Sequence, residues 1–482
     1  MPPNLAELND ICYDVIIHYR MVYCKEIREL MGKRGYGIVR TELTHMDRGR
    51  ARMLKDMLAS FRDVSAFLIH VACDNAPDIL TLSSFNQLTA MERLVHRTKD
   101  NPSPAYVQFD KLFPRYPSYM RRSAIHFAVG HVQSHETRCD AYYEYRDALV
   151  SRRKHVKRMA PGFTYTPNAC PTMYRKESLK VNQGTVDLKV LRRGQWVWET
   201  FTLAARDYKS LQKASLCGDV KNPKLVHEYG KFYLEFPVKY RTKQYPDLPL
   251  DRQLAIGCDL GLTNGAVLSA VDSRGSVHGR WFSPFKGDMA RIDHTINLIR
   301  KYAALSGKGQ SLAALYTKLE GLKDNYVKQL SRWIVNRAID AGAYCIVLEH
   351  LGRMRGRGAL AARTHHWCTA RIRDYVQGMA ARKGIRVFIV NPRGTSMFAY
   401  DGSGPVKRDE HNYSLCTFAS GKRYNCDLSA SYNIAARYFL RAARKSMPAK
   451  VWSESGAKVP GLSKGTTWTL ATLRALSEAA AS

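Results

Sequence analysis

The chain has 482 residues, with 75 Lys or Arg against 42 Asp or Glu, which gives a formal net charge of +33. Its 45% hydrophobic and 24% charged residues exclude a disordered chain and are typical of a globular protein with roughly two to four domains. Such a surplus of positive charge disfavours a compact protein that binds no polyanion, and nucleic acid is the polyanion that it favours.

Residues 1–160 have the pattern of a helical region. One helical face is predicted from the three-and-four spacing of its apolar residues, which are Leu54, Met57, Leu58, Phe61, Val64 and Leu68. Basic and aromatic residues alternate in FPRYPSYMRRSAIHF, and the basic run SRRKHVKRM ends the region. Such runs form either a solvated face or a phosphate-binding one, and with this net charge we expect nucleic-acid contacts. The residues concerned are Arg121, Arg122, Arg152, Arg153 and Lys154.

Residues 161–250 have the pattern of a small β domain. Short alternating runs separated by turn residues occur in SLKVNQGTVDLKVL, QWVWETFTLA and KFYLEFPVKY. The polar segment YRTKQYPDLPLDRQ, which holds two prolines, then has the composition of a linker.

Strands and helices alternate in the remainder of the chain. LAIGCDLGLTNGAVLSAV is predicted to form two strands around a T-N-G turn, and SVHGRWFSPF a third strand. A long helical region follows, with one face formed by Leu312, Leu315, Leu319, Leu322, Tyr326, Leu330 and Trp333. The next elements are the strand AYCIVLEHL, the helix WCTARIRDYVQGMAARKG, the strand IRVFIVNP and the helix DLSASYNIAARYFLRAARK. Three consecutive strands followed by alternating helices and strands predict a ribonuclease-H-like α/β domain.

Nothing in the sequence indicates a membrane protein or a disulfide framework. No stretch reaches the roughly 20 apolar residues of a membrane span, so an anionic membrane surface is a weaker alternative to nucleic acid. The N-terminus MPPNLAELND lacks the pattern of a secretory signal, and the 11 cysteines form no Cys-x-x-Cys pair. We therefore expect a cytoplasmic protein with reduced cysteines.

Three carboxylates occupy conspicuous positions in the α/β region. Asp259 ends the first strand, Glu349 ends the strand CIVLE, and Asp427 precedes the last long helix. Strand ends and helix starts of one sheet can converge, and three converging carboxylates repel one another unless cations neutralise them. Magnesium suits such oxygen ligands, and two ions about 3.5–4 Å apart could hydrolyse a phosphodiester.

Each acid also has an ordinary interpretation when it is taken alone. Asp427 could be only a helix N-cap, Glu349 a salt-bridge partner and Asp259 a turn former. The three acids in this order and on these elements are more specific than any one of them.

The segments that carry these acids resemble a known family. IGCDLGLTNGAVLS, IVLEHLGRM and CDLSASYNIA resemble the three RuvC motifs of the type V CRISPR effectors and of their transposon-encoded relatives, the TnpB proteins. NPRGTS resembles the Pro-x-x-Thr-Ser step before the nuclease-lobe module of that family. The resemblance covers about residues 251–445 in detail, and the enlarged helical N-terminus favours a compact CRISPR effector over a transposon nuclease.

The resemblance implies a magnesium-dependent endodeoxyribonuclease of a prokaryotic antiviral defence, in which Asp259, Glu349 and Asp427 are the catalytic metal ligands and manganese can replace magnesium. It implies a guide RNA and a target DNA as partners, with a short DNA motif beside the target. Arg371 and Arg393 join the expected nucleic-acid contacts.

The resemblance also implies an order of regions along the chain. Residues 1–160 correspond to a recognition-like region and 161–250 to a wedge-like domain. Residues 251–392 correspond to the first two RuvC motifs, 393–426 to the inserted module, 427–445 to the third motif and 446–482 to a tail.

The inserted module departs from the zinc ribbon that relatives carry. The first expected cysteine pair is replaced by SMFAYDGSG, and only Cys416 and Cys426 stand near the second, so four zinc ligands would require His411 and a remote residue. We expect a zinc-free module held by the packing of Tyr400, Tyr413, Phe418 and Tyr424. In RTHHWC, the adjacent His365 and His366 point apart on a helix, so a metal site with Cys368 is not expected. The altered module puts the efficiency of cleavage in doubt more than guided binding.

Two other functions stay open at this point. A guided DNA-binding protein that represses with little cleavage differs only in what the acids do. GCDLGLTN also resembles the phosphate-binding hairpin of the actin and sugar-kinase ATPases, but VLEHL and NCDLSAS offer no second glycine-rich loop.

Overall fold

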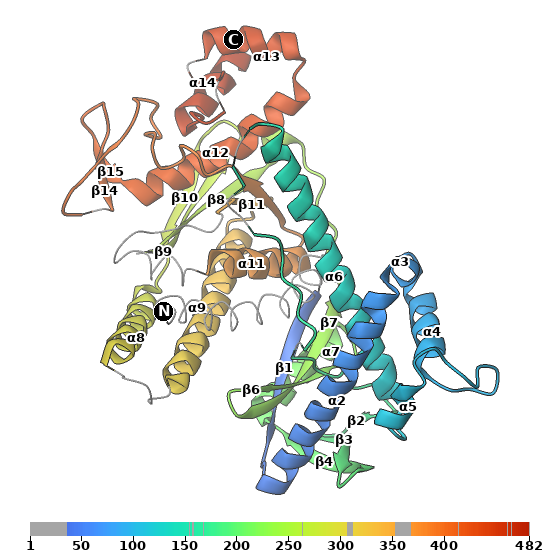
Figure 1. The fold of residues 1–482 in the computed structure, drawn as a ribbon. Coiled ribbons are helices and arrows are strands. Elements are labelled where there is room, and N and C mark those ends of the chain that lie inside the picture. Colours follow the sequence, from blue (N-terminus) through green and yellow to red (C-terminus); the bar gives the residue numbers. More distant parts are fainter. Residues whose placement is uncertain are drawn as a thin grey trace. The chain divides into compact units, whose positions relative to one another are not determined.

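A computed structural model describes residues 36–153, 155–156, 159–166, 168–262, 264–305, 312–351, 368–412, 414–459, 461–463 and 465–481. The chain forms two compact units, here called unit 1 and unit 2. Of the described residues, unit 1 holds Ile38–Lys239, and unit 2 holds Tyr240 onward together with Tyr36 and Gly37. It is a mixed α/β protein (Figure 1). None of the helices among the described residues combines the length and hydropathy that a membrane crossing requires.

The helices of unit 1 confirm the predicted helical pattern. Those before residue 161 are α2 (Arg48–Asp74), α3 (Ala76–Ile79), α4 (Ser84–Val95), α5 (Gln108–Leu112) and α6 (Ser118–Val150), and α2 packs against α6. The helix α2 begins where the side chain of Asp47 accepts a hydrogen bond from the backbone N of Arg50. All six apolar residues predicted to form one face of α2 are buried. Burial of this stripe holds the helix in place.

The sheet of unit 1 is built from β1 (Tyr36–Thr44), β2 (Leu179–Val181), β3 (Thr185–Arg192), β4 (Gln195–Leu203), β5 (Gly218–Val220), β6 (Lys224–Glu228) and β7 (Lys231–Tyr240). The strand order is β2-β3-β4-β1-β7-β5, with β6 paired to β7, and α7 (Ala205–Cys217) lies between β4 and β5 in the chain. The expectation of a wholly helical N-terminal region is wrong for β1. In β1, Val39, Thr41 and Leu43 are buried while their neighbours are not, which is the period of a strand and not of a helix.

Unit 2 contains a second sheet with the strand order β10-β9-β8-β11-β12. Its strands are β8 (Leu254–Gly261), β9 (Gly265–Asp272), β10 (Val277–Phe282), β11 (Cys345–Glu349) and β12 (Arg386–Val390). The pairs β8–β9 and β9–β10 are antiparallel, whereas β8–β11 and β11–β12 are parallel. Each of these strands lies in a segment that the sequence predicts to be a strand.

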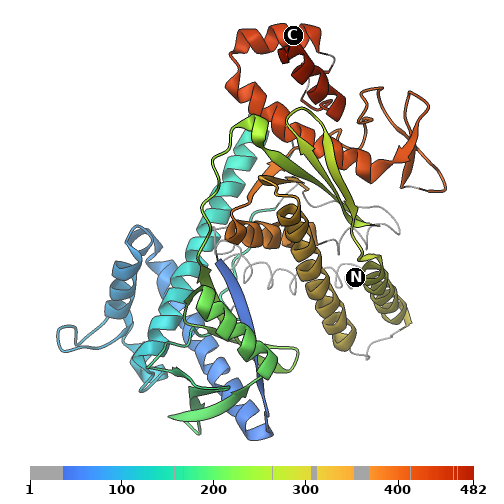
Figure 2. The same ribbon diagram turned by 180° about the vertical axis from the view of Figure 1, so that it is seen from behind.

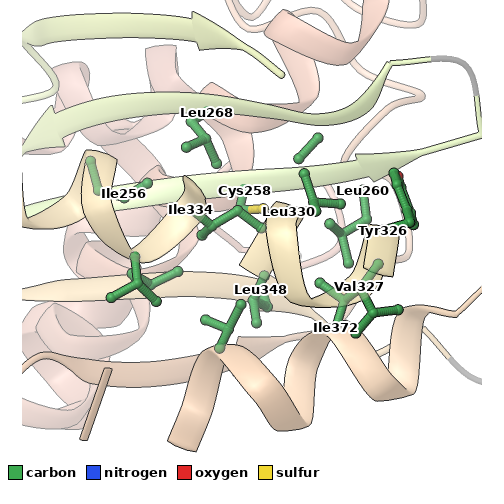
Figure 3. Packing of buried hydrophobic residues seen from close by; sticks show 14 of the residues in the cluster. Ile256, Cys258, Leu260, Leu268, Tyr326, Val327, Leu330, Ile334, Leu348 and Ile372 are labelled. Atoms are coloured by element: carbon green, nitrogen blue, oxygen red, sulfur yellow. The ribbon is translucent and has the colours of Figure 1, made fainter. Parts of the chain in front are cut away.

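Helices cover both faces of the unit 2 sheet (Figures 1 and 2). One face packs against α8 (Lys286–Leu305), α9 (Ala313–Asp340) and α11 (Thr369–Lys383). Figure 3 shows Cys258 and Leu260 of β8 against Val327 and Leu330 of α9. The other face packs against α12 (Cys426–Ser446) and α14 (Leu470–Ala481), and α13 (Ala449–Lys458) precedes α14. A sheet that is buried on both faces explains the almost continuous apolar runs of its strands.

The inserted module contains a small three-stranded sheet of β13 (Lys407–Arg408), β14 (Leu415–Thr417) and β15 (Arg423–Asn425). The rings of Tyr400, Phe418 and Tyr424 lie within 5.0–5.8 Å of one another, centroid to centroid. They cover the buried Cys416 and Cys426. The predicted aromatic packing is therefore confirmed for these three rings, and Tyr413 lies outside the described residues.

Candidate catalytic carboxylate site

The strand register of unit 2 places Asp259 beside Glu349. The strands β8 and β11 run parallel with Cys258 opposite Leu348, so the next residue of each strand points to the same side of the sheet. Cys258 and Leu260 point toward α9, and alternation therefore turns Asp259 to the α12 side (Figure 3). Glu349 is buried there, with 9% of its surface exposed. Two acids 90 positions apart in the chain thus become neighbours because their strands pair.

A close approach of α12 to β8 brings in Asp427. A Cβ atom on Gly257 would lie 2.1 Å from the backbone O of Ser431, so only glycine allows the helix this near to the strand. Asp427 is in the first turn of α12, and Asn425 caps that turn by accepting from the backbone N of Leu428 at 2.9 Å. A Cβ on Gly261 would stand 3.7 Å from Oδ2 of Asp427, which puts this carboxylate over the end of β8.

Glu349 and Asp427 both act electrostatically on Asp259. Burial raises the pKa of Asp259 well above its usual value, the charges of Glu349 and Asp427 raise it further, and Arg408 acts in the opposite direction. Burial also raises the pKa of Glu349, against the lowering effects of a hydrogen bond from Thr395 and the charge of Arg437. Converging like charges in a partly desolvated site produce this pattern. The structure therefore brings together the three acids that the sequence predicted.

The three acids do not form a ready metal site by themselves. Among the described residues, no group of three or more Asp, Glu, His or Cys side chains is placed so that it could hold a metal ion. Magnesium is commonly held by only one or two carboxylates together with water and substrate phosphate. An all-oxygen donor set of carboxylates fits magnesium or manganese and does not fit the nitrogen and sulfur preference of zinc.

Neighbouring side chains hold Glu349 in place. Thr395 donates from its hydroxyl to Oε1 of Glu349 at 2.5 Å. The buried amide of Asn433 fixes the Thr395 segment by donating to the carbonyls of Thr395 and Phe398 at 3.0 and 2.9 Å, and its Oδ1 accepts from the backbone N of Leu470. Asn433 thereby connects α12, the Thr395 segment and the start of α14.

Arg437 adds a buried positive charge near Glu349. Its guanidinium donates to the carbonyl oxygens of Asn391 at 2.6 Å and Thr466 at 2.9 Å. Burial lowers the pKa of Arg437 to about 10, and the charge of Glu349 acts against that lowering. The guanidinium contacts carbonyls and leaves the carboxylate oxygens of Glu349 to other partners.

Two supporting residues were not identified as functional from the sequence. Asn264 donates from Nδ2 to Oδ2 of Asp427 at 2.7 Å, and Thr395 binds Glu349. Both stand in segments that the sequence singled out, T-N-G and NPRGTS, but there Asn264 was interpreted only as a turn residue. The turn also differs in detail, because Gly265 begins β9 opposite Gly261 with φ of 71° and so belongs to the strand.

The basic residues proposed for nucleic-acid contact in unit 1 differ in their surroundings. Arg121 is buried and its Nε lies 3.4 Å from Oε1 of Glu92, so the structure does not favour it as a phosphate contact. Arg122 is half-buried beside Glu177 and the ring of Tyr174. Arg152 and Arg153 are exposed just after α6, and Lys154 lies outside the described residues.

The two proposed contacts in unit 2 also differ. Arg371 on α11 is paired with Glu320 and Asp324, which already neutralise its charge, so the structure does not favour it either. Arg393 is exposed two residues before Thr395. His365 and His366 lie outside the described residues, and Cys368 directly precedes α11.

Comparison with known proteins gives one sequence-family match and several structural matches. The Aq_aa04 family matches residues 38–192. No curated protein matches the chain. The chain is similar in structure to compact type V CRISPR effectors. This is the group that the motifs resemble, whereas the relation to TnpB proteins stays a prediction.

Three of these structures show the extent of the similarity. The mini-RNA-guided endonuclease CRISPR-Cas_phi3 is 10% identical with a TM-score of 0.49, over 83% of this chain and 92% of that one. CasPhi-2 (Cas12j) bound to crRNA and phosphorothioate-DNA is 11% identical with a TM-score of 0.48, over 84% and 91%. The Cas12f1–sgRNA–target DNA complex is 11% identical with a TM-score of 0.30, over 83% and 98%.

Proposed function

We propose that the protein is an RNA-guided DNA endonuclease whose unit 2 is a ribonuclease-H-like RuvC domain. It binds a guide RNA, recognises a short motif in target DNA and hydrolyses DNA phosphodiesters with magnesium at the carboxylate site. The matched structures include an RNA-guided endonuclease and a protein bound to crRNA and phosphorothioate-DNA.

The convergence of Asp259, Glu349 and Asp427 carries this proposal. Glu349 on β11 and Asp427 on α12 lie near enough to Asp259 on β8 to raise its pKa, and the three acids follow the order expected of the three RuvC motifs. The sheet order β10-β9-β8-β11-β12 supports the ribonuclease-H-like assignment, because the first three strands form a meander and two parallel strands extend it. A lone structural acid would instead be paired with a base of the same chain.

The residues of the site divide the work between holding charge and holding position. Asp259, Glu349 and Asp427 would hold the divalent ions, which supply an activated water and stabilise the leaving oxygen. Thr395 and Asn264 orient the carboxylates of Glu349 and Asp427 through hydrogen bonds. Their donors carry no charge, so the cluster keeps the negative charge that attracts a cation.

Nucleic acid would bind to basic surface of the chain outside the three carboxylates. The net charge of +33 supplies a general attraction for nucleic acid phosphates. Near the site, Lys407 and Arg408 of the inserted module are exposed, as is Arg393. With sequence reading assigned to base pairing, such a protein needs charge and shape more than base-specific contacts.

The experiment begins with RNA that co-purifies with the full chain expressed together with its neighbouring locus. That RNA is sequenced, and DNA carrying its complement is incubated with the complex and magnesium. We expect cleavage by the wild type, and Asp259→Asn should lower the rate by about 10³-fold or more while DNA binding persists, because metal-assisted catalysis contributes several kcal/mol. Asp272→Asn is the matched control, since this acid of β9 pairs with His278 away from the cluster.

Two outcomes would change the assignment. Guided DNA binding without wild-type cleavage would favour a repressor over a nuclease. Equal cleavage by the wild type and Asp259→Asn would overturn the carboxylate site altogether.

A further inference from the structure

Asn264 makes a direct hydrogen bond to one of the three acids. Its Nδ2 lies 2.7 Å from Oδ2 of Asp427, across 163 positions of the chain. Only 4% of the Asn264 surface is exposed, so water is a poor substitute for this contact. A hydrogen bond from a neutral donor to a half-buried carboxylate such as Asp427 is stronger than a bond between two neutral groups.

The loop backbone leaves the Asn264 side chain little freedom. The carbonyl of Asn264 accepts from the hydroxyl of Ser283 and from the backbone N of Ala266 at 2.8 Å. Ser283 in turn donates its backbone N to the carbonyl of Ala266 at 3.0 Å. The next residue, Gly265, has a positive φ, and a Cβ there would lie 2.7 Å from Oη of Tyr326. Asn264 is therefore held by Ser283, directly after β10, while Gly265 lies close to Tyr326 of α9, and the amide of Asn264 bonds to Asp427 of α12.

Asp427 could have been held in another way. It lies in the first turn of α12, where free backbone N–H groups attract a carboxylate. Asn425 serves the cap instead, by accepting from Leu428. A Lys or Arg at the Asn264 position would fix Asp427 equally well, but its charge would compete with a metal ion. A neutral amide restrains one oxygen and leaves the carboxylate its charge.

We propose that Asn264 is a positioning residue for Asp427, which restrains Oδ2 so that the other oxygen remains available to a divalent cation. This inference rests on the proposed function of the site. Partners that orient a metal ligand typically change metal affinity by about 10–100-fold when they are removed.

The test measures metal binding separately from cleavage. Manganese is titrated calorimetrically into the full chain with its co-purified RNA and without DNA, for the wild type and Asn264→Ala. We expect about tenfold weaker manganese binding by the variant. In cleavage assays, the magnesium concentration for half-maximal rate should rise by a similar factor, with much of the rate recovered at saturating magnesium. A purely structural role would lower the amount of active protein without moving that concentration.

Two further variants keep the inference testable. Ser283→Ala removes the hydroxyl that holds the Asn264 carbonyl, and it should shift manganese affinity in the same direction by a smaller factor, even if Asn264→Ala fails to fold. Asn75→Ala is the matched control, because Asn75 donates to the carbonyl of Val71 within unit 1.

This inference alone would be overturned if Asn264→Ala changed neither the manganese affinity nor the magnesium concentration for half-maximal cleavage rate. If Asn264→Ala does not fold, the same result for Ser283→Ala would overturn it. A wild type that neither binds manganese nor cleaves would overturn the proposed function instead.

Discussion

In the sheet of unit 1, acids on neighbouring strands face bases, whereas in the sheet of unit 2 they face one another. Arg40 on β1 lies 2.6 Å from Oε2 of Glu228 and 3.5 Å from Oε1 of Glu235, and Lys231 lies 2.8 Å from Oε1 of Glu42. No ion pair seen among the described residues includes Asp259, Glu349 or Asp427. An acid that stabilises the fold is paired with a base of the same chain. A cluster of acids without such a base indicates that a cation binds there from solution.

The strands of the two sheets also differ in how completely they are buried. In β7 of unit 1, buried and partly exposed residues alternate, and the outward positions carry the ion pairs. In unit 2, β9 and β11 are buried along almost their whole length, because helices cover both faces. Few positions in such a sheet can carry charge. Glu349 is the last residue of β11, and Asp259 stands two residues before the end of β8.

The largest effect should come from separating α12 from the unit 2 sheet. Gly257→Ala places a methyl group on the backbone of Ser431 and Ala435, so we expect a loss of about 3 kcal/mol or more of unfolding free energy and loss of cleavage. Limited proteolysis should show unit 2 opening while unit 1 stays protected. Gly321→Ala is the matched control, since this exposed glycine of α9 has no neighbour within 4 Å and alanine should stabilise the helix by about 0.5–1 kcal/mol. A Gly257→Ala protein as stable as the wild type would mean that the close approach of α12 is not required.

The next effect concerns the hydroxyl that holds Glu349. Thr395→Val keeps the side-chain shape and removes the hydrogen bond, so cleavage should fall by about 10–100-fold. Thr41→Val is the matched change in the unit 1 sheet, where the buried Thr41 hydroxyl donates to the carbonyl of Leu234. We expect that variant to lose about 1 kcal/mol of stability without any change in cleavage. If Thr395→Val and Thr41→Val lowered cleavage equally, the Thr395 hydroxyl would have no special role at the carboxylate site.

Neutralising an acid of the unit 2 cluster and neutralising a paired acid of unit 1 should change the unfolding free energy in opposite directions. Asp259→Asn removes a charge that its neighbours repel, so the metal-free protein should gain about 1–2 kcal/mol in unfolding free energy while cleavage is lost. Glu228→Gln removes a partner of Arg40 and should lower stability by up to about 1 kcal/mol. Urea unfolding of both variants and the wild type at neutral pH provides the measurement. Destabilisation by Asp259→Asn would show that the cluster is structural.

The smallest effect is the pH dependence of these differences. The pKa of Asp259 is higher in the folded chain than in the unfolded one, so its cost to folding disappears as the pH falls from the raised value to the ordinary one. The advantage of Asp259→Asn should therefore shrink on acidification.

For Asp110 in unit 1, burial raises the pKa, but hydrogen bonds from Arg97 and His96 outweigh it and lower the pKa overall. Asp110→Asn should consequently be destabilising at neutral pH, and its deficit should vanish as the pH falls through that lowered value. The unfolding free energies of the wild type and of both variants are measured across this pH range. The comparison is contradicted if acidification changes the stability of both variants, relative to the wild type, in the same direction.

Much of the local structure was predictable because it depends on residues close together in the chain. The apolar stripe of α2 has a helical period, and the strands around Asp259 and Glu349 are short, almost continuous apolar runs; the sequence displays both patterns directly. The strand β1 was missed although its alternation is visible, because the helical pattern of the following residues was extended over it. The basic runs were a weaker guide, since Arg121 falls on the inward face of α6 and Arg371 beside two acids.

The sequence by itself determined the types of the main elements, the order of the three acidic motifs and the positive charge that favours nucleic acid. Only the tertiary structure decided that Asn264 contacts Asp427 and that Thr395 contacts Glu349, across 163 and 46 positions. Periodicity is a property of neighbouring residues and is written along the chain. Contacts between distant residues depend on how closely the elements pack, and here a single glycine, Gly257, sets how near α12 comes to β8.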